Sequence, residues 1–246
     1  MLYSAKSELR AEVAGSYLNW LWWILDPLLF MLVYTFVVRI VFTAKEQYFS
    51  AFVLVGLTAW NFFNKSVQGS VNIIRKNKSV VSKIYLPKYL LILTNMMVLA
   101  FKMAVSFALI FILMLILQVP FTLHILHAVP ILLVLVTVTF GVSTIFMHFG
   151  VFVRDLSNVT AVLLRLVFYM TGVFYSIPLR VPEPYGGLLL NLNPLAFLTE
   201  SLRGALLYGS APDYLLLGVW FLIGLALTAV GITTVYRYEN SYAKVI

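Results

Sequence analysis

Six apolar runs divide this chain, and they constrain its fold more than any other feature. The runs cover residues 28–42, 49–63, 89–117, 129–153, 159–177 and 214–236. A helix needs about 20 apolar residues to cross a bilayer, so six such helices would leave little of the chain outside the membrane. Only 11% of the residues are charged and 62% are hydrophobic, which excludes a water-soluble globular protein. The sequence therefore predicts an all-α membrane protein with six transmembrane helices.

The segment before the first run is predicted to lie in the membrane interface. Residues 1–25 place apolar side chains at near-helical spacing opposite a charged face, as an amphipathic interface helix does. Three tryptophans would anchor this helix among the lipid headgroups: Trp20, Trp22 and Trp23. Asp26 and Pro27 then predict the start of the first span, because Asp caps helices and Pro is tolerated at the first helical position. Residues 26–246 would form the six-span domain.

The positive residues favour one side of the bilayer. If the N-terminus is inside, eleven Lys and Arg fall on the cytoplasmic side and four on the other side, while Lys102 and Arg165 lie within spans. Cytoplasmic loops carry an excess of Lys and Arg, so both termini are predicted to be cytoplasmic. The net charge of +8 is then mainly a topology signal and does not require a nucleic-acid partner.

The connection between the second and third runs is strongly basic. Residues 64–88 hold six Lys and Arg with apolar residues interleaved. This pattern indicates either a docking helix or a solvated positive loop that sets topology and touches lipid phosphates.

The connection between the fifth and sixth runs is too apolar for an ordinary loop. Residues 178–212 are rich in Leu, Ala, Phe and Tyr but contain five prolines, which prevent one continuous helix. Two short re-entrant helices, at residues 185–192 and 195–208, fit both facts, because non-spanning backbone is tolerated at membrane depth where protein or water covers it.

The sequence lacks the common catalytic signatures. It has no GxxxxGK[ST] phosphate loop, no GxSxG elbow and no HExxH pair, so nucleotide hydrolysis on this chain is not expected. His124 and His127 form an HxxH pair, but no acidic residue or cysteine is near enough in sequence to complete a metal site. We interpret them as a polar pair at headgroup level and His148 as a packing residue, and we expect neither a metal nor a cofactor on this chain.

Two charged residues lie inside predicted spans, where each costs about 2.5 to 3.5 kcal/mol on insertion scales. Lys102 is about 20 Å along its helix from Tyr89. It either snorkels to the outer headgroups or faces a translocation path or an internal carboxylate. Arg165 lies close enough to the cytoplasmic surface to snorkel there.

Aromatic residues gather in the first, second and fifth runs. Aromatic faces stack on the apolar faces of sugar rings, so these side chains indicate either the lining of a path for a glycan or ordinary interface and core packing. The residues are Tyr34, Trp60, Phe62, Phe63, Phe168, Tyr169 and Tyr175.

Short motifs occur in a set order along these runs. They are Asp26-Pro27-Leu28 after the tryptophans, Gly56-Leu57 with Trp60, Lys83 with Pro87, Arg154-Asp155-Leu156, and Asn193-Pro194-Leu195 followed by Arg203. With this order and topology, nearly the whole chain resembles the membrane subunit of a type-2 ABC exporter. The resemblance is to the branch that exports lipid-linked cell-surface polysaccharides such as wall teichoic acid and O-antigen. Asn19 departs from the family pattern, in which Gly is usual.

The resemblance implies a homodimer whose interface is the path, with two separate ATPase subunits that hold ATP and Mg²⁺ beneath it. The substrate would be an undecaprenyl-linked polysaccharide in a bacterial cytoplasmic membrane, and the tryptophans would border its lateral access. Residues 72–88 would form a gate and coupling helix, and residues 153–158 a second contact with the ATPases. The implied coupling residues are Arg75, Lys76, Lys78, Lys83, Tyr85, Pro87, Lys88, Arg154 and Asp155.

Three alternatives compete with this interpretation. A type-2 ABC permease for a drug or small lipid would have the same topology. A membrane-embedded enzyme acting on lipid-linked sugars would need acidic residues or histidines clustered at one face, whereas the nine acids here are scattered. A non-transporting scaffold would not explain Lys102.

Overall fold

The computed structural model describes residues 5–7, 9–10, 19–38, 46–81 and 86–245, and every regular element in these ranges is a helix. The long helices are α2 (Asn19–Phe36), α3 (Phe49–Val71), α6 (Tyr89–Ile116), α7 (Ala128–Phe152), α8 (Leu156–Met170) and α12 (Tyr214–Val245). The short ones are α4 (Ile73–Lys76), α5 (Lys78–Val81), η2 (Leu123–His127), α9 (Ile177–Arg180), α10 (Tyr185–Leu192), α11 (Pro194–Arg203) and the π-helical turn η3 (Gly204–Tyr208).

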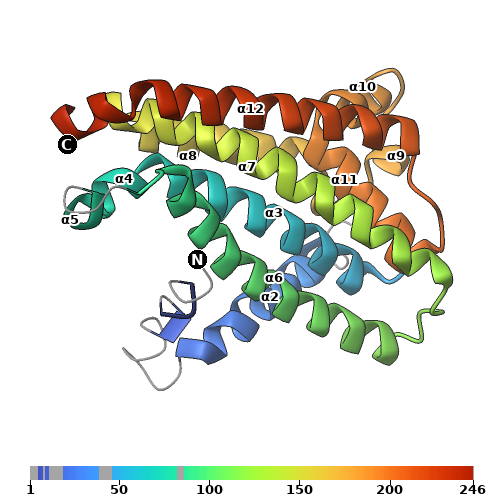
Figure 1. Cartoon of the computed structure of the whole chain (residues 1–246). Helices are drawn as coiled ribbons and strands as arrows, with labels where there is room; N and C mark the ends of the chain where they lie inside the picture. The colour runs from blue at the N-terminus through green and yellow to red at the C-terminus, as the bar shows by residue number, and fades with distance from the viewer. Residues whose placement is uncertain (1–4, 8, 11–18, 39–45, 82–85, 246) are drawn as a thin grey trace.

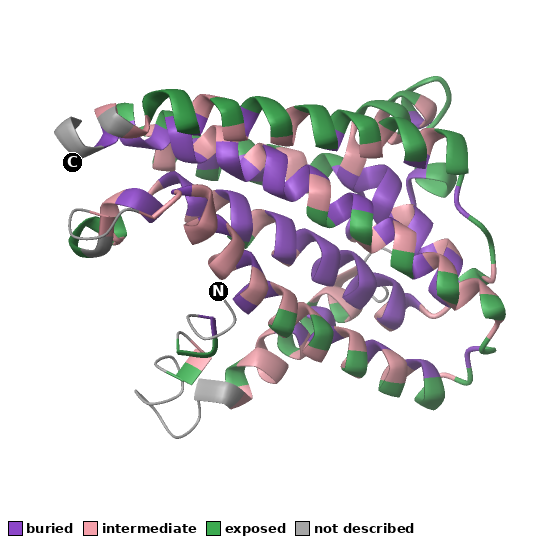
Figure 2. Ribbon diagram, in the orientation of Figure 1, coloured by how far each residue is buried: buried purple, intermediate pink, exposed green. Residues whose placement is uncertain are grey.

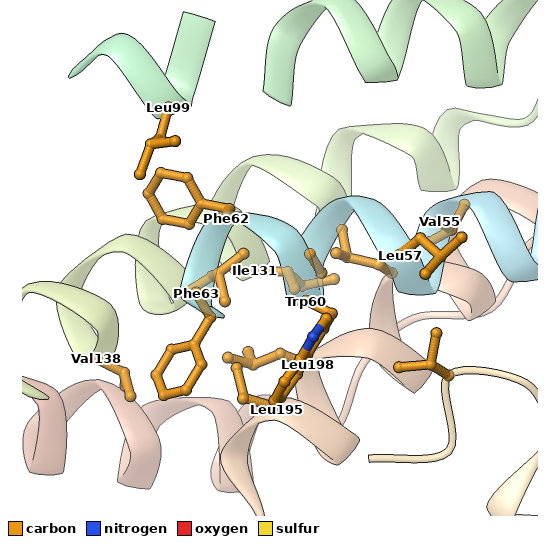
Figure 3. Packing of buried hydrophobic residues seen from close by; sticks show 14 of the residues in the cluster. Val55, Leu57, Trp60, Phe62, Phe63, Leu99, Ile131, Val138, Leu195 and Leu198 are labelled. Carbon is orange, nitrogen blue, oxygen red and sulfur yellow. The ribbon is translucent and has the colours of Figure 1, made fainter. Parts of the chain in front are cut away.

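Helix α3 is the centre of the bundle. It packs against α2, α6, α7, α8 and α11, while α12 lies along α7 (Figure 1). Figure 2 shows α3 buried along most of its length and α12 exposed on one side. In Figure 3, Phe62 of α3 points toward Leu99 of α6, and Trp60 points toward Leu195 and Leu198 of α11. Side chains of α3 thus pack against different neighbouring helices on different sides of α3.

The outer surface of the bundle suits a lipid environment. Three helices are long and apolar enough to cross a membrane, Tyr89–Ile116, Leu123–Phe152 and Tyr214–Glu239, and Leu21–Phe36 and Leu156–Met170 are shorter apolar helices. Large apolar side chains on these helices are exposed, for example Leu215 at 78%. An exposed apolar surface of this extent marks contact with a membrane or a partner.

Helix α2 corrects the predicted start of the first span. The described helix spans Asn19–Phe36 and continues through Pro27, so the predicted helix start at Asp26 and Pro27 is wrong. Proline inside a helix removes one hydrogen bond, and transmembrane helices tolerate this where neighbours satisfy the freed carbonyl. Asp26 pairs with Lys65 of α3 at 3.8 Å. Of the predicted interface helix, residues 1–4, 8 and 11–18 lie outside the described residues.

Two other helix ends differ from the apolar runs. Helix α3 runs to Val71, eight residues past the predicted end, because Ser66 and Ser70 are buried against neighbouring helices. Helix α8 stops at Met170 because Gly172 has a left-handed φ of 67°. A glycine adopts this conformation without steric cost, and the chain turns there.

The segment after α8 forms short helices near the positions predicted for the re-entrant pair. Helix α10 spans Tyr185–Leu192, and α11 with η3 covers Pro194 to Tyr208. Asn193 starts α11 by accepting hydrogen bonds from the amides of Leu195 and Ala196. Pro194 occupies the first turn, which its fixed φ favours. Six spans and the membrane depth of these helices remain predictions.

Candidate functional site

A polar cavity of about 400 Å³ lies between α2, α3 and α6, and we call it the α2–α3–α6 cavity. It takes Trp22, Trp23, Asp26 and Pro27 from α2, and Thr58, Asn61, Phe62 and Lys65 from α3. Leu99, Lys102, Met103 and Ser106 of α6 complete its described lining. Four of these were predicted for the substrate path: Trp22, Trp23, Phe62 and Lys102.

Three charged side chains line this cavity. The Lys65 ammonium is 3.8 Å from the Asp26 carboxylate, and both side chains are about half exposed. The Lys102 ammonium lies 5.5 Å from the ring centroid of Trp23, within the range of a cation–π interaction. Lys102 thus lines a cavity that also contains a carboxylate.

A smaller cavity of about 180 Å³ is lined by Asp26, Phe30, Tyr34, Leu57, Trp60, Asn61 and Phe168. It shares Asp26 and Asn61 with the α2–α3–α6 cavity, so the two are neighbours. Trp60 packs 5.1 Å from Phe168, and Tyr34 stacks on Phe174 at 3.7 Å. The polar cavity therefore continues into an aromatic one.

The remaining residues predicted for the path lie elsewhere. Phe63 lines an apolar cavity of about 760 Å³ between α3, α7, α8 and α10. Tyr169 is exposed, and its carbonyl accepts a 2.7 Å hydrogen bond from the Tyr175 hydroxyl. The side chain of Trp20 lies outside the described residues. The structure thus divides the described aromatic residues among three cavities and a fourth place, where Tyr175 contacts the exposed Tyr169.

Asn61 and Lys65 are not among the residues predicted for the path, although both line the polar cavity. Their signal in the sequence is that they are polar residues at the end of an apolar run. Placing them on one face with Asp26 requires knowing that α2 crosses α3, which the sequence does not state.

The ends of α3 and α7 meet near α4, and we call this end of the bundle the α4 end. Arg75 donates a 2.9 Å hydrogen bond to the carbonyl of Val151. Gln68 donates to the carbonyl and hydroxyl of Ser157, at 3.0 and 3.2 Å. A Cβ on Gly150 would lie only 2.8 Å from the carbonyl carbon of Val71. Each segment predicted to contact the ATPases is therefore tied to a neighbouring long helix: Arg75 to the end of α7, and Ser157 to α3.

The predicted coupling residues differ in exposure. Lys76, Lys78, Arg154 and Asp155 are exposed, whereas Arg75 and Pro87 are partly buried. Lys88 is only 7% exposed, so its predicted place on a docking surface is not supported by its position. Lys83 and Tyr85 lie outside the described residues.

At the opposite end, which we call the α11 end, Arg203 joins three segments. Its side chain is 1% exposed. The guanidinium donates to the carbonyls of Phe52, Gly172 and Val173 at 3.2, 3.0 and 2.8 Å. It also pairs with Glu200 at 3.2 Å. A buried charge is tolerated when it is paired and hydrogen-bonded, and these contacts tie α11 to α3 and to the turn after α8.

A second ion pair closes the α11 end. Arg180 donates two hydrogen bonds to the Glu46 carboxylate, at 3.0 and 3.2 Å. Burial alone would raise the pKa of the Glu46 carboxyl, but the hydrogen bonds and charge of Arg180, with backbone hydrogen bonds, lower this pKa below its ordinary value. Glu46 is therefore ionised at neutral pH and holds α9 against the start of α3.

The histidines make local contacts. The His127 ring is 2.6 Å from the Tyr214 hydroxyl, and the His148 ring is 2.7 Å from the Tyr242 hydroxyl. The rings of His124 and His127 pack at a tilt, with centroids 5.3 Å apart. Within the described part of the chain, no three His, Cys, Asp or Glu side chains gather in a way that could hold a metal ion.

Comparison with known proteins agrees with the predicted class. Residues 3–207 match the ABC-2 type transporter family. The chain is 25% identical over 240 residues to an "O-antigen export system permease protein RfbA" of Klebsiella pneumoniae, covering 97% of this chain and 92% of the relative. A protein of the same name from Myxococcus xanthus is 30% identical over 214 residues, which cover 84% of this chain and 79% of the relative.

Proposed function

The chain belongs to the ABC-2 type transporter family, and on this premise we propose that it is the permease subunit of an ATP-driven exporter of a lipid-linked cell-surface polysaccharide. The observation that carries the proposal is the alignment with O-antigen export permeases over 97% of the chain. The aromatic cavity beside Trp60 supports it, because aromatic faces contact sugar rings without requiring tight binding.

The proposed exporter contains two copies of this chain and two ATPase subunits. ATP and Mg²⁺ bind the ATPases, in keeping with the lack of a phosphate loop in this sequence. Two permease copies would form the path at their interface. The undecaprenyl-linked substrate would approach laterally, past the tryptophans at the start of α2.

In this proposal the α4 end faces the cytoplasm and the ATPases. The excess of Lys and Arg on this side supports the orientation. The exposed Lys76, Lys78, Arg154 and Asp155 form the docking surface. The Arg75–Val151 hydrogen bond would pass motion of α4 directly to α7. Helices α10 and α11 would lie in the outer leaflet as the re-entrant pair.

The relatives' names support a polysaccharide substrate over a drug or small lipid. An enzyme acting on lipid-linked sugars is disfavoured by the chain's family. Nothing in the cavities favours wall teichoic acid over O-antigen, and both fit the proposal.

Coexpression with an ABC ATPase subunit from the same organism tests the proposal. We expect a stable complex whose ATP hydrolysis rises when a lipid-linked glycan is added. Two results would refute the proposal. One is a permease that purifies without the ATPase, and the other is a stable complex whose rate of ATP hydrolysis does not change when the glycan is added.

A further inference from the structure

We propose that the α2–α3–α6 cavity binds the phosphate headgroup of a lipid, with Lys102 and Lys65 supplying the positive charge. The cavity lies within a single copy of the chain, between three of its own helices. Its described lining therefore needs no residue from a second copy. The existence of the site does not depend on the proposed function. Only the question of whether its lipid is the polysaccharide carrier or a bulk phospholipid rests on that function.

The charge of the lining favours an anion. Two lysines and one aspartate are the charged residues of the described lining, which gives a formal charge of +1. Both side chains of the Asp26–Lys65 pair are about half exposed and line the cavity, so the Lys65 ammonium can donate to a ligand as well as to Asp26. Phosphate oxygens accept charge-assisted hydrogen bonds from ammonium groups. The same positive charge would repel a cationic headgroup.

The position of Lys102 is the second observation. A lysine far along an apolar helix such as α6 is costly in a bilayer unless it faces a partner or a water-filled cavity. Here the ammonium lies over the Trp23 ring at 5.5 Å. Trp23 is itself packed edge-on against Phe101, with centroids 5.9 Å apart. The ring therefore holds the ammonium toward the cavity instead of letting it extend to a headgroup region along its own helix.

The surroundings of the cavity suit a lipid rather than a free anion. Trp22 borders it and is 54% exposed, and tryptophan is enriched where headgroups meet hydrocarbon. Exposed apolar side chains continue from the cavity along the bundle surface, Leu29 and Phe30 on α2 and Phe101 on α6. A headgroup in the cavity would place its hydrocarbon chain against these residues, and a volume of about 400 Å³ lies in the usual range of small-ligand sites.

Lipid binding to the purified permease, without any ATPase, tests this site. The protein is placed in nanodiscs of phosphatidylcholine and titrated with undecaprenyl diphosphate, phosphatidylglycerol or inorganic pyrophosphate, with tryptophan fluorescence as the readout. We expect both anionic lipids to bind and pyrophosphate to bind more weakly. Tighter binding of undecaprenyl diphosphate identifies the carrier as the ligand, whereas equal binding supports the same site with bulk phospholipid as the ligand.

Variants assign the binding to the cavity. Lys102→Gln should weaken lipid binding about tenfold or more, as expected for the loss of a charge-assisted hydrogen bond worth about 1.5 to 3 kcal/mol. Lys102→Arg should restore most of it. The matched control is Arg165→Gln, which removes a positive charge from α8, outside the cavity lining. Thermal unfolding confirms that each variant is folded.

Two results would overturn the site. One is the absence of saturable binding of either anionic lipid to the folded wild-type protein. The other is equal affinity of wild type, Lys102→Gln and Arg165→Gln. Because no ATPase and no transport are involved, either result would leave the exporter proposal standing, and a failed export assay would leave the lipid site untouched.

Discussion

The Arg75 guanidinium donates a 2.9 Å hydrogen bond to the main-chain carbonyl of Val151. This bond joins α4, which follows the central helix α3, to the last turn of α7. Since α7 also packs along α12, a displacement of α4 is felt by two long helices. In the proposed exporter, this contact would pass movement of α4 to the interior of the permease.

Replacing Arg75 with Ala should therefore separate ATP hydrolysis from export. The variant loses a charge-assisted bond worth about 1.5 to 3 kcal/mol, and α4 can then move without α7. We expect near-normal ATPase activity of the assembled complex and a strong loss of export. Arg75→Lys, which retains the charge but not the planar fork, should fall between the two. Normal export by the Ala variant would contradict the role of this bond.

The exposed lysines of α4 and α5 should control assembly with the ATPase. Reversing both charges in Lys76→Glu/Lys78→Glu should weaken copurification of the ATPase and make the remaining binding less sensitive to salt, because exposed charges mainly affect steering and rim contacts. The charge-preserving pair Lys76→Arg/Lys78→Arg is the control. Equal ATPase recovery with both double variants would remove these residues from the docking surface.

Gly150 permits the close approach of α7 to α3. A Cβ there would lie 2.8 Å from the carbonyl carbon of Val71, so Gly150→Ala should lower the free energy of unfolding by about 1 to 3 kcal/mol, as overpacking usually does. The control is Gly218→Ala on α12, where a Cβ meets nothing within 4 Å. The melting temperatures of the two variants are compared by thermal unfolding in detergent. An unchanged melting temperature for Gly150→Ala would contradict the role of Gly150, because α7 could then move away from α3 without loss of stability.

The Glu46–Arg180 pair should make stability depend on pH. The pKa of the Glu46 carboxyl is lower in the folded protein than in the unfolded chain. Its contribution is therefore fully present above the ordinary pKa of a glutamate and is lost as the pH falls through the lower, folded value. The difference in melting temperature between wild type and Glu46→Gln should shrink on acidification below pH of about 4.

Arg180→Gln removes the same ion pair from the other side. The difference in melting temperature between wild type and Arg180→Gln should therefore also shrink as the pH falls. A gap between wild type and Glu46→Gln that stays constant, or widens, as the pH falls would contradict this account of the pair.

The long apolar runs predicted helices well because hydrophobicity is a local property. Helices α6 and α7 end within one residue of their runs, and α10 spans the residues expected for the first short helix. The end of α3 could not be predicted in the same way. Ser66 and Ser70 look like loop residues, but neighbouring helices bury them.

Partners distant in sequence explain the remaining differences. Pro27 looked like a helix start, but α2 packs against α3 and continues past the proline. Arg203 was predicted as a motif residue, yet its acceptors on Phe52, Gly172 and Val173 come from segments whose packing no local pattern reveals. Lys102 was expected either to snorkel to the outer headgroups or to face a path or a carboxylate, and only the fold shows that it lines a cavity together with Asp26 and Lys65.

Export in inverted membrane vesicles tests the central claim most directly. With the cytoplasmic face outward, lipid-linked polysaccharide and ATP are added outside, and the polysaccharide that becomes protected from an added glycosidase is measured. The account predicts protection that requires ATP, the partner ATPase and this chain together. Protection that is absent, or equal in vesicles lacking this chain, would contradict it.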